Sequence, residues 1–463
     1  MNSLDLILRN GTVITPDGLQ QTDIAVADGK IVSLAAPGAA REEIDATGLH
    51  IFPGVIDSHV HFNEPGRADW EGIATGSRAL AAGGGTLFFD MPLNAHPPTC
   101  DAASFDEKLL AAQEQSVTDF ALWGGLVPGN LDKMEQLAAR GVIGFKAFMA
   151  DSGIGDFSCV DDATLKAGMR RAAELGRLVA VHAESEPITA RLTVEALAEN
   201  RISVRDYLNS RPIYQELEAI QRAIHIAGET KCSLHIVHVS SGAGVALVAS
   251  ARSHGADVTC ETCPHYLVMT EDDMERIGAL AKCAPPLRTK SAQDVLWRYL
   301  EKGHICTVGS DHSPSTPEMK RNFNFFKVWG GISGVQHTLS LLLTEWSAGL
   351  RPGVFAEPTA SDLLDQRPAL QLISDLLSAN AAARFNIPNK GRIAAGFDAD
   401  FALVDLKRKF TVAKEDLLYR HPQSPYVGRT LTGRVVRTIL RGQTIYKDGK
   451  ITTTGGGKLI KPA

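Results

Sequence analysis

Two histidines near the start of the chain have the type and spacing of metal ligands. His59 and His61 stand in the sequence Asp57-Ser-His-Val-His, directly after the apolar residues 51–56. Residues two positions apart on a strand share a face, so both imidazoles point into the same space. Neutral imidazole is a common ligand of first-row metals. The pair therefore favours a metal site over two histidines that face solvent.

A lysine in the middle of an apolar run is a second candidate. Lys146 lies within Val142-Ile-Gly-Phe-Lys-Ala-Phe-Met. Burying its ammonium ion is costly unless the charge is paired or neutralised. Two interpretations stay open from the run itself: the side chain snorkels to an open end of the fold, or it serves the chemistry there.

Three more polar residues end apolar runs further along the chain. His182 and His238 are each either a hydrogen-bonded core histidine or a ligand, and Asp311 alone is also compatible with capping a loop. His235, three residues before His238, faces the other way and is interpreted as structural. Taken together, four histidines, a buried lysine and an aspartate at strand ends are the set that two divalent ions with a shared bridge require.

The elements that must position these residues alternate regularly. Eight short apolar runs alternate with segments of helical period, at 55–62, 86–92, 120–127, 142–149, 178–183, 234–239, 257–262 and 305–310. This alternation predicts an α/β fold, a (β/α)8 barrel of the TIM type. A doubly wound sheet also alternates, but no Gly-x-Gly-x-x-Gly follows the first strand. In a barrel the candidate residues all stand at the carboxyl ends of strands, where catalytic groups lie.

Both ends of the chain have a different sequence pattern, which is typical of β-strands joined by turns. Short alternating runs are separated by Asn10-Gly11 and Asp28-Gly29 near the start and by Arg441-Gly442 near the end, which are hairpin signals. Neither end is large enough to bury a core. We expect them to pair into one small β-sandwich formed by residues 1–52 and 390–463, with the barrel over residues 53–389.

Composition narrows the functional class. The net charge is −6 without a block of like charges, which argues against nucleic acid or a membrane surface as partner. No signal peptide and no apolar run of about 20 residues is found. The seven cysteines are scattered, which favours reduced thiols and a cytoplasmic location. Cys260 and Cys263 form a single CxxC and are interpreted as ordinary buried thiols.

The ordered set of candidate residues resembles the cyclic amidohydrolases, a family that comprises dihydroorotases, hydantoinases or dihydropyrimidinases, and allantoinases. The resemblance covers essentially the whole chain. It implies two divalent ions, zinc first with cobalt, manganese or iron as alternatives, and a homotetramer. It also implies that CO2 converts Lys146 to N6-carboxylysine, which bridges the ions. The implied ligands are His59, His61 and Asp311 for one ion, and His182 and His238 for the other.

The resemblance also implies a mechanism. A metal-bridged hydroxide attacks the ring amide. Asp311 takes up the proton and passes it to the leaving nitrogen, first as base and then as acid.

Two positions decide between the branches of the family. Dihydroorotases carry an arginine two residues after the second histidine, where this chain has Asn63. Hydantoinases carry a tyrosine five residues after the lysine, where this chain has Asp151 in a loop with two glycines at residues 151–156. Further motifs, among them Glu64-Pro-Gly-Arg, Cys260-Glu-Thr-Cys-Pro-His and Trp329-Gly-Gly-Ile-Ser-Gly, are similar to those of allantoinases.

This branch implies hydrolysis of the cyclic amide of allantoin to allantoate, in purine catabolism. The candidate substrate contacts are Asn94, Cys283, Ser313 and the glycine backbone at Gly331, with Ala284 where relatives often have serine. A hydantoinase is the alternative enzyme. A scaffold protein that has lost its ligands is a distant alternative, because all six ligand residues are present.

Overall fold

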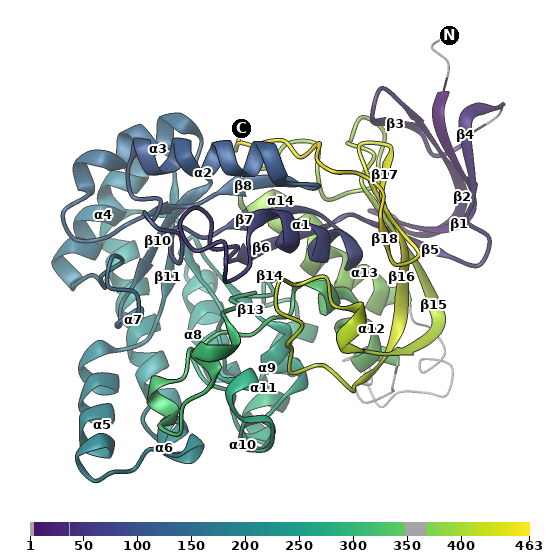
Figure 1. Cartoon of the computed structure of the whole chain (residues 1–463). Coiled ribbons are helices and arrows are strands. Elements are labelled where there is room, and N and C mark those ends of the chain that lie inside the picture. Colours follow the sequence, from purple (N-terminus) through teal and green to yellow (C-terminus); the bar gives the residue numbers. More distant parts are fainter. Residues whose placement is uncertain (1–3, 37, 348–366) are drawn as a thin grey trace.

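A computed structural model describes residues 4–36, 38–347 and 367–463 of the chain. Figure 1 shows a barrel ringed by helices, with a sheet built from both ends of the chain beside it.

The barrel contains the eight predicted strands. They are β6 (Val55–Val60), β7 (Gly85–Asp90), β8 (Asp119–Leu122), β10 (Gly144–Phe148), β11 (Leu178–His182), β12 (Leu234–Ile236), β13 (Val258–Thr262) and β14 (Thr307–Val308). The short β9 (Gly124–Gly125) continues β8 and pairs with β10. All neighbouring strands run parallel. A bridge between Val60 and His312 joins the last strand to the first and closes the ring. The predicted TIM-type barrel is confirmed.

Helices surround these strands. They are α1 (Ile73–Ala82), α2 (Ala102–Gln115), α3 (Met134–Arg140), α4 (Asp162–Glu174), α5 (Glu186–Ala198), α6 (Val204–Asn209), α7 (Ile213–Thr230), α8 (Gly242–Ser253), α9 (Pro264–Val268), α10 (Glu271–Ile277), α11 (Lys290–Glu301), α12 (Thr338–Ser347), α13 (Arg367–Ser374) and α14 (Asn380–Arg384). Local sequence explains their starts: the Asp101 side chain accepts from the Ser104 amide at α2, and Ser241 accepts from Gly244 at α8. Such side-chain caps satisfy amides that have no partner inside the helix.

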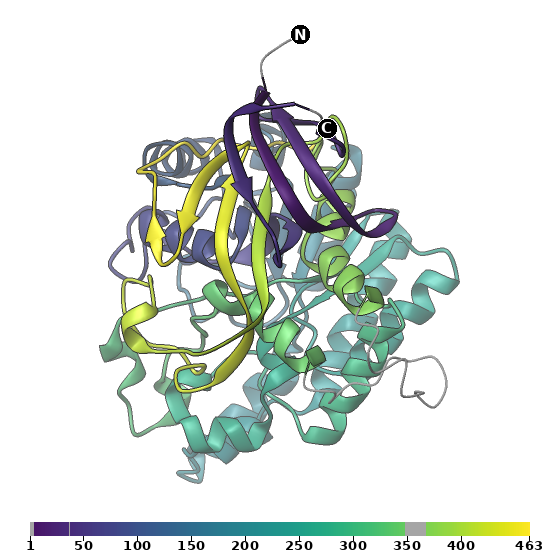
Figure 2. The same ribbon diagram turned by 90° about the vertical axis from the view of Figure 1, so that its right-hand side faces the viewer.

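The two ends of the chain meet in one nine-stranded sheet (Figure 2). Its strands are β1 (Leu4–Thr15), β2 (Gly18–Ala27), β3 (Lys30–Ser33), β4 (Ala40–Asp45), β5 (His50–Pro53), β15 (Phe401–Thr411), β16 (Thr430–Leu440), β17 (Gln443–Lys447) and β18 (Lys450–Ile451). Antiparallel pairing of β5 with β15 joins the N-terminal strands to the C-terminal ones. Leu8 of β1, Phe401 of β15 and Ile439 of β16 share one buried cluster, so residues of both ends form a common core.

One predicted hairpin turn is wrong. Asn10-Gly11 is not a turn, because β1 runs through it from Leu4 to Thr15 with a register shift between Leu8 and Gly11. The left-handed Asn10, with a φ of 61°, forms a β-bulge there, and a bulge bends the strand that carries it. Before the bulge β1 pairs with β4, and after it with β5. The other two predicted turns, Asp28-Gly29 and Arg441-Gly442, lie between consecutive strands as expected.

A buried ionic cluster fastens the sheet to the barrel. The Nζ atom of Lys390 lies 2.7 Å from a carboxylate oxygen of Asp119 at the start of β8, 2.9 Å from Asp398 and 2.6 Å from Asp400. Arg441, which precedes β17, also pairs with Asp119. The lysine side chain is 2% exposed, so these charges depend on one another rather than on water. Within the described part of the chain, no helix is long and apolar enough to span a membrane.

Candidate metal centre

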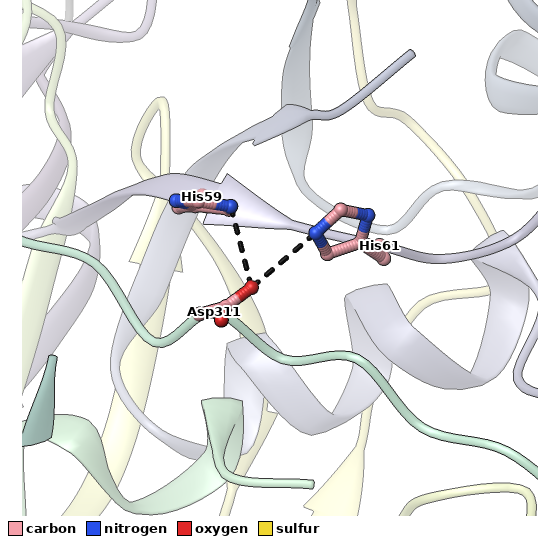
Figure 3. Close-up of side chains that lie close together, drawn as sticks. All are labelled: His59, His61 and Asp311. Carbon is pink, nitrogen blue, oxygen red and sulfur yellow. Dashed lines mark ion pairs between the residues drawn. The ribbon is translucent and has the colours of Figure 1, made fainter. Parts of the chain in front are cut away.

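The ends of β6 and β14 bring three predicted ligands together (Figure 3). One carboxylate oxygen of Asp311 lies 3.3 Å from Nε2 of His59 and 3.3 Å from Nε2 of His61. Ligand atoms about 2.0–2.2 Å from a tetrahedral ion lie roughly 3.3–3.6 Å apart. The three side chains therefore have the spacing of ligands around one ion.

A second pair lies at the ends of β11 and β12. Nδ1 of His182 is 3.0 Å from Nε2 of His238, and the rings meet edge to face. Burial lowers the pKa of both imidazoles, as it does for His61. Neutral imidazole is the form that binds a metal, so the lowered pKa values of these three histidines favour metal binding.

Lys146 on β10 interacts electrostatically with members of both clusters. Its side chain is fully buried and its Nζ atom has no hydrogen-bond partner. Burial lowers its pKa to about 7, against the opposing pull of Asp311 and Glu261. The ammonium in turn lowers the pKa of His182 and of His238. A buried amine that has no hydrogen-bond partner and whose charge interacts with both clusters fits a group that is modified or that binds a ligand.

Two carboxylates orient the histidines from behind, and the sequence prediction assigned neither of them a role. Glu261 on β13 lies 2.8 Å from Nδ1 of His59, and Glu184 lies 2.9 Å from Nε2 of His182. Each contact occupies the ring nitrogen that faces away from the candidate ion, so the other nitrogen is left to bind it. Glu184 stands two residues after His182, a spacing that was available in the sequence as a signal.

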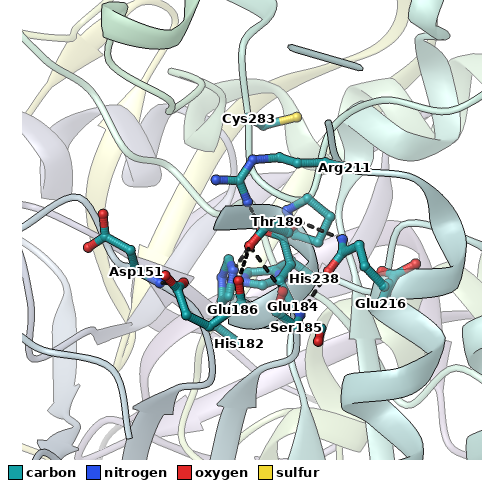
Figure 4. A network of polar contacts seen from close by, with 12 residues as sticks. Asp151, His182, Glu184, Ser185, Glu186, Thr189, Arg211, Glu216, His238 and Cys283 are labelled. Atoms are coloured by element: carbon teal, nitrogen blue, oxygen red, sulfur yellow. Dashed lines mark hydrogen bonds and ion pairs between the residues drawn. The ribbon is translucent and has the colours of Figure 1, made fainter. Parts of the chain in front are cut away.

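Figure 4 shows how Glu184 is itself held. It is fully buried and accepts hydrogen bonds from Arg211 at 2.7 Å and Gln215 at 2.7 Å. Burial alone would raise the pKa of Glu184, but Arg211 and His182 bring it down to about 2. The carboxylate therefore stays ionised and can orient the imidazole.

Two of the candidate ligands have a strained backbone. His238 and Asp311 have φ values of 40° and 45°, in the left-handed region that such residues seldom adopt. Strain of this kind costs of order 1–3 kcal/mol and is typical of functional sites. Both residues come shortly after the end of a strand, where the left-handed backbone changes the direction of the chain.

A cavity opens above these residues. It is lined by His59, His61, Leu93, Asn94, Phe148, Asp151, Ser152, His182, His238, Cys283, Ala284, Asp311, Ser313, Trp329, Gly330 and Gly331. The four predicted substrate contacts, Asn94, Cys283, Ser313 and Gly331, all line it. The Asn94 amide donates to the Ser313 hydroxyl at 3.3 Å. The structure thus gathers the predicted substrate contacts above the predicted ligands.

Other predicted residues lie outside the cavity. His235 is buried with Nδ1 2.7 Å from the Thr259 hydroxyl, as a structural histidine would be. Asn63 is buried and donates to the Pro314 carbonyl at 3.3 Å. Cys260 and Cys263 are buried, and neither forms a disulfide. Cys263, His265 and Asp311 do have side-chain ligand atoms within 4.8 Å of one another, so Cys263 lies behind the aspartate.

Comparisons with known proteins agree with this arrangement. Residues 50–445 match the model of the amidohydrolase family. An allantoinase of Rubrobacter xylanophilus is 54% identical over 100% of this chain and 98% of its own length. An allantoinase of Deinococcus radiodurans is 50% identical over 99% of both chains. The solved L-hydantoinase of Arthrobacter aurescens is 35% identical, with a TM-score of 0.92 over 99% of this chain and 100% of that one.

The family match extends over most of the sequence, and the relatives match it from end to end. Amidohydrolases are metal-dependent hydrolases, which agrees with the groups of candidate ligands at the strand ends. This chain belongs to the amidohydrolase family.

Proposed function

We propose that this chain is an allantoinase, which hydrolyses the ring amide of allantoin to allantoate. The observation that carries the proposal is a cavity over two clusters of imidazoles whose described lining contains no arginine or lysine. Allantoin is a neutral ring with a ureido arm and needs hydrogen-bonding groups rather than a cation. Relatives at 50–54% identity that bear the name allantoinase support the same substrate.

The donor sets fit two divalent ions. His59, His61 and Asp311 would hold one ion and His182 and His238 the other, with Lys146 as N6-carboxylysine between them. Carboxylation would turn the unpartnered amine of Lys146 into an anionic ligand. Bound ions would make a water molecule acidic and polarise the amide carbonyl. Zinc is the expected metal, since histidine and carboxylate ligands suit it.

Asp311 moves the proton in this reaction. Burial alone would raise its pKa, but His59 and His61 lower it below the usual range. The carboxylate is therefore ionised and able to accept a proton from the attacking water, then to deliver it to the leaving ring nitrogen. Glu261 and Glu184 keep His59 and His182 in the orientation that binding requires.

A substrate panel tests the proposal. The metal-reconstituted protein is assayed with allantoin, hydantoin, dihydrouracil and dihydroorotate. We expect turnover of allantoin to exceed the others by orders of magnitude, because a site built to pair a polar arm discriminates strongly against ligands that leave its polar groups unpaired. Comparable turnover of dihydrouracil or hydantoin would favour a hydantoinase instead. A hydantoinase is the second candidate because of the likeness to the solved L-hydantoinase.

We also propose the division of the chain into a terminal unit (residues 1–52 and 390–463) and a barrel unit (53–389). A homotetramer and a cytoplasmic location stay predictions. Sedimentation of the purified protein and fractionation of cells test them.

A further inference from the structure

One wall of the cavity is a strap of main chain, residues 325–331. It begins with a single 3-10 turn at Phe325–Lys327 and ends at Gly331. Its last three residues, Trp329, Gly330 and Gly331, line the cavity. A Cβ atom on Gly331 would lie 2.1 Å from the Ser313 carbonyl oxygen, so the strap packs directly against another residue of the site.

A buried lysine holds the first half of the strap. The Nζ atom of Lys282 donates to the carbonyl oxygens of Phe325 at 2.7 Å, Phe326 at 3.2 Å and Val328 at 2.6 Å. The Lys282 residue is 4% exposed, and its own carbonyl accepts from the Gly331 amide at 2.8 Å. Both ends of the strap are thus tied to the residue that precedes Cys283 in the cavity lining.

A second lysine holds the cavity-facing half. The Nζ atom of Lys320 donates to the carbonyl oxygens of Trp329 at 2.9 Å, Gly331 at 2.7 Å and Ala279 at 3.2 Å. An ammonium group has three N–H donors and no acceptor. Each lysine therefore donates all three N–H groups to main-chain carbonyls. Five of these six carbonyls belong to the strap.

These two cations lack the usual partners. Among the ion pairs of the described residues, neither Lys282 nor Lys320 has a carboxylate. Burial lowers the pKa of each to about 7. Hydrogen bonds from an ionised donor are roughly twice as strong as neutral ones. Burying two cations beside the cavity costs free energy, and both are bonded to the same short strap. This arrangement indicates a functional role in addition to packing.

The bonding fixes the direction of one peptide group. In a trans peptide the carbonyl and the following N–H point in opposite directions. Since the Trp329 carbonyl points at Lys320, the Gly330 N–H points away from it. Gly330 lines the cavity, and its N–H makes no hydrogen bond with the described residues. Within the described residues it is therefore an unused donor in the wall of the cavity.

We propose that Lys282 and Lys320 are positioning residues for substrate binding: they hold the strap so that the Gly330 amide donates to a carbonyl of the cyclic substrate. This rests on the proposed function only in requiring a cyclic amide, because every compound in the substrate panel has such carbonyls. Neither lysine is among the residues that line the cavity. Their effect reaches it through the main chain.

Lys320→Met and Lys282→Met test the proposal in the metal-reconstituted protein, assayed with the best substrate of the panel. We expect KM to rise by up to about tenfold, the effect of losing one hydrogen bond between neutral groups. We expect metal content at the wild-type level and a smaller change in kcat. Lys320→Gln, which keeps two donors, should recover part of the loss. Arg321→Met is the matched control, since Arg321 is the next residue. Its side chain is 75% exposed, and its one ion pair among the described residues is with Glu318 at 3.8 Å.

Unchanged KM in both lysine variants would overturn the proposal. So would a fall in kcat that parallels loss of metal, or a Lys320→Gln variant as weak as Lys320→Met, because each would indicate a merely structural role. If Lys320→Met does not fold, Lys320→Gln with its measured KM decides. Poor turnover of allantoin by the wild type would instead contradict the proposed function, and the lysine variants would still be scored on the preferred substrate.

Discussion

At the scale of single residues, Lys146 gives the sharpest test of the metal centre. If it bridges two ions as a carbamate, Lys146→Ala should lose metal and activity. A short carboxylic acid added with excess metal should restore part of both. Lys146→Arg should be equally inactive, because a guanidinium neither carboxylates nor ligates. Metal content and turnover are the measurements, and an alanine variant with two ions and full activity would exclude the bridge.

Asp311→Asn removes the proposed proton carrier with little change of shape. We expect turnover to fall by ~10²–10⁴-fold, the usual contribution of general acid–base catalysis, in addition to any loss of metal. The sign of the pH dependence follows from the lowered pKa of Asp311. A depressed carboxyl pKa keeps the base ionised as pH falls, so an acidic limb near neutral pH must come from other groups. If Asp311→Asn leaves the rate unchanged, Asp311 is not the proton carrier.

At this scale the sequence predicted much. Residue type and spacing identified the six candidate ligands. The structure brings five of them around one cavity, and the sixth, Lys146, is buried within β10. Glu261 and Glu184 were not assigned, because the partner of a histidine's second nitrogen depends on which strands lie side by side. Lys282 and Lys320 were assigned no role, because nothing in their local sequence shows that they are buried against a strap of carbonyls.

At the scale of elements, β13 serves the site through Glu261. Its carboxylate contacts His59 and Ser58 on β6 and lies 3.3 Å from the Thr307 hydroxyl on β14. Glu261→Gln should lower metal affinity by about 10–100-fold, as loss of a ligand's orienting partner does. Titration of the metal-free protein with zinc measures it.

Glu216→Gln is the matched control for that experiment. Glu216 is equally buried but bonds to Ser240 and Ser241 rather than to a histidine. Equal losses of metal affinity in the two variants would indicate general damage to the barrel. They would count against an orienting role for Glu261.

The elements themselves were mostly predictable. Alternation of apolar runs and helical periods located all eight barrel strands, although β12 and β14 are shorter than their runs. In both cases the run continues past the last residue that pairs in the sheet. The chain leaves the sheet at that point, and His238 and Asp311 then line the cavity. The hairpin turn predicted at Asn10-Gly11 was wrong because a left-handed residue can lie either in a turn or in a β-bulge. The choice depends on strands β4 and β5, beyond the local sequence.

At the scale of the whole molecule, Lys390 fastens the terminal sheet to the barrel. Lys390→Met leaves the carboxylates of Asp119, Asp398 and Asp400 buried without their shared cation. We expect a loss of about 3–5 kcal/mol of stability, the usual result of removing one partner from a buried pair. Thermal unfolding and limited proteolysis measure it. Lys166→Met, which breaks a surface pair with Glu229, should change little, and a similar melting temperature in both variants would contradict the role of Lys390.

The strand order of the nine-stranded sheet also determines when its two halves can pair during translation. β5 ends at Pro53 and its partner β15 begins at Phe401, so residues 54 to 400 must be translated between them. At about 5–20 residues per second this takes roughly 20 to 70 seconds. During that interval β5 lacks its partner β15, and the apolar side chains of β1 to β5 lack those of β15 and β16 that complete their common core. A ribosome stalled before residue 401 should therefore carry a chain whose N-terminal strands are cleaved by protease, however complete its barrel.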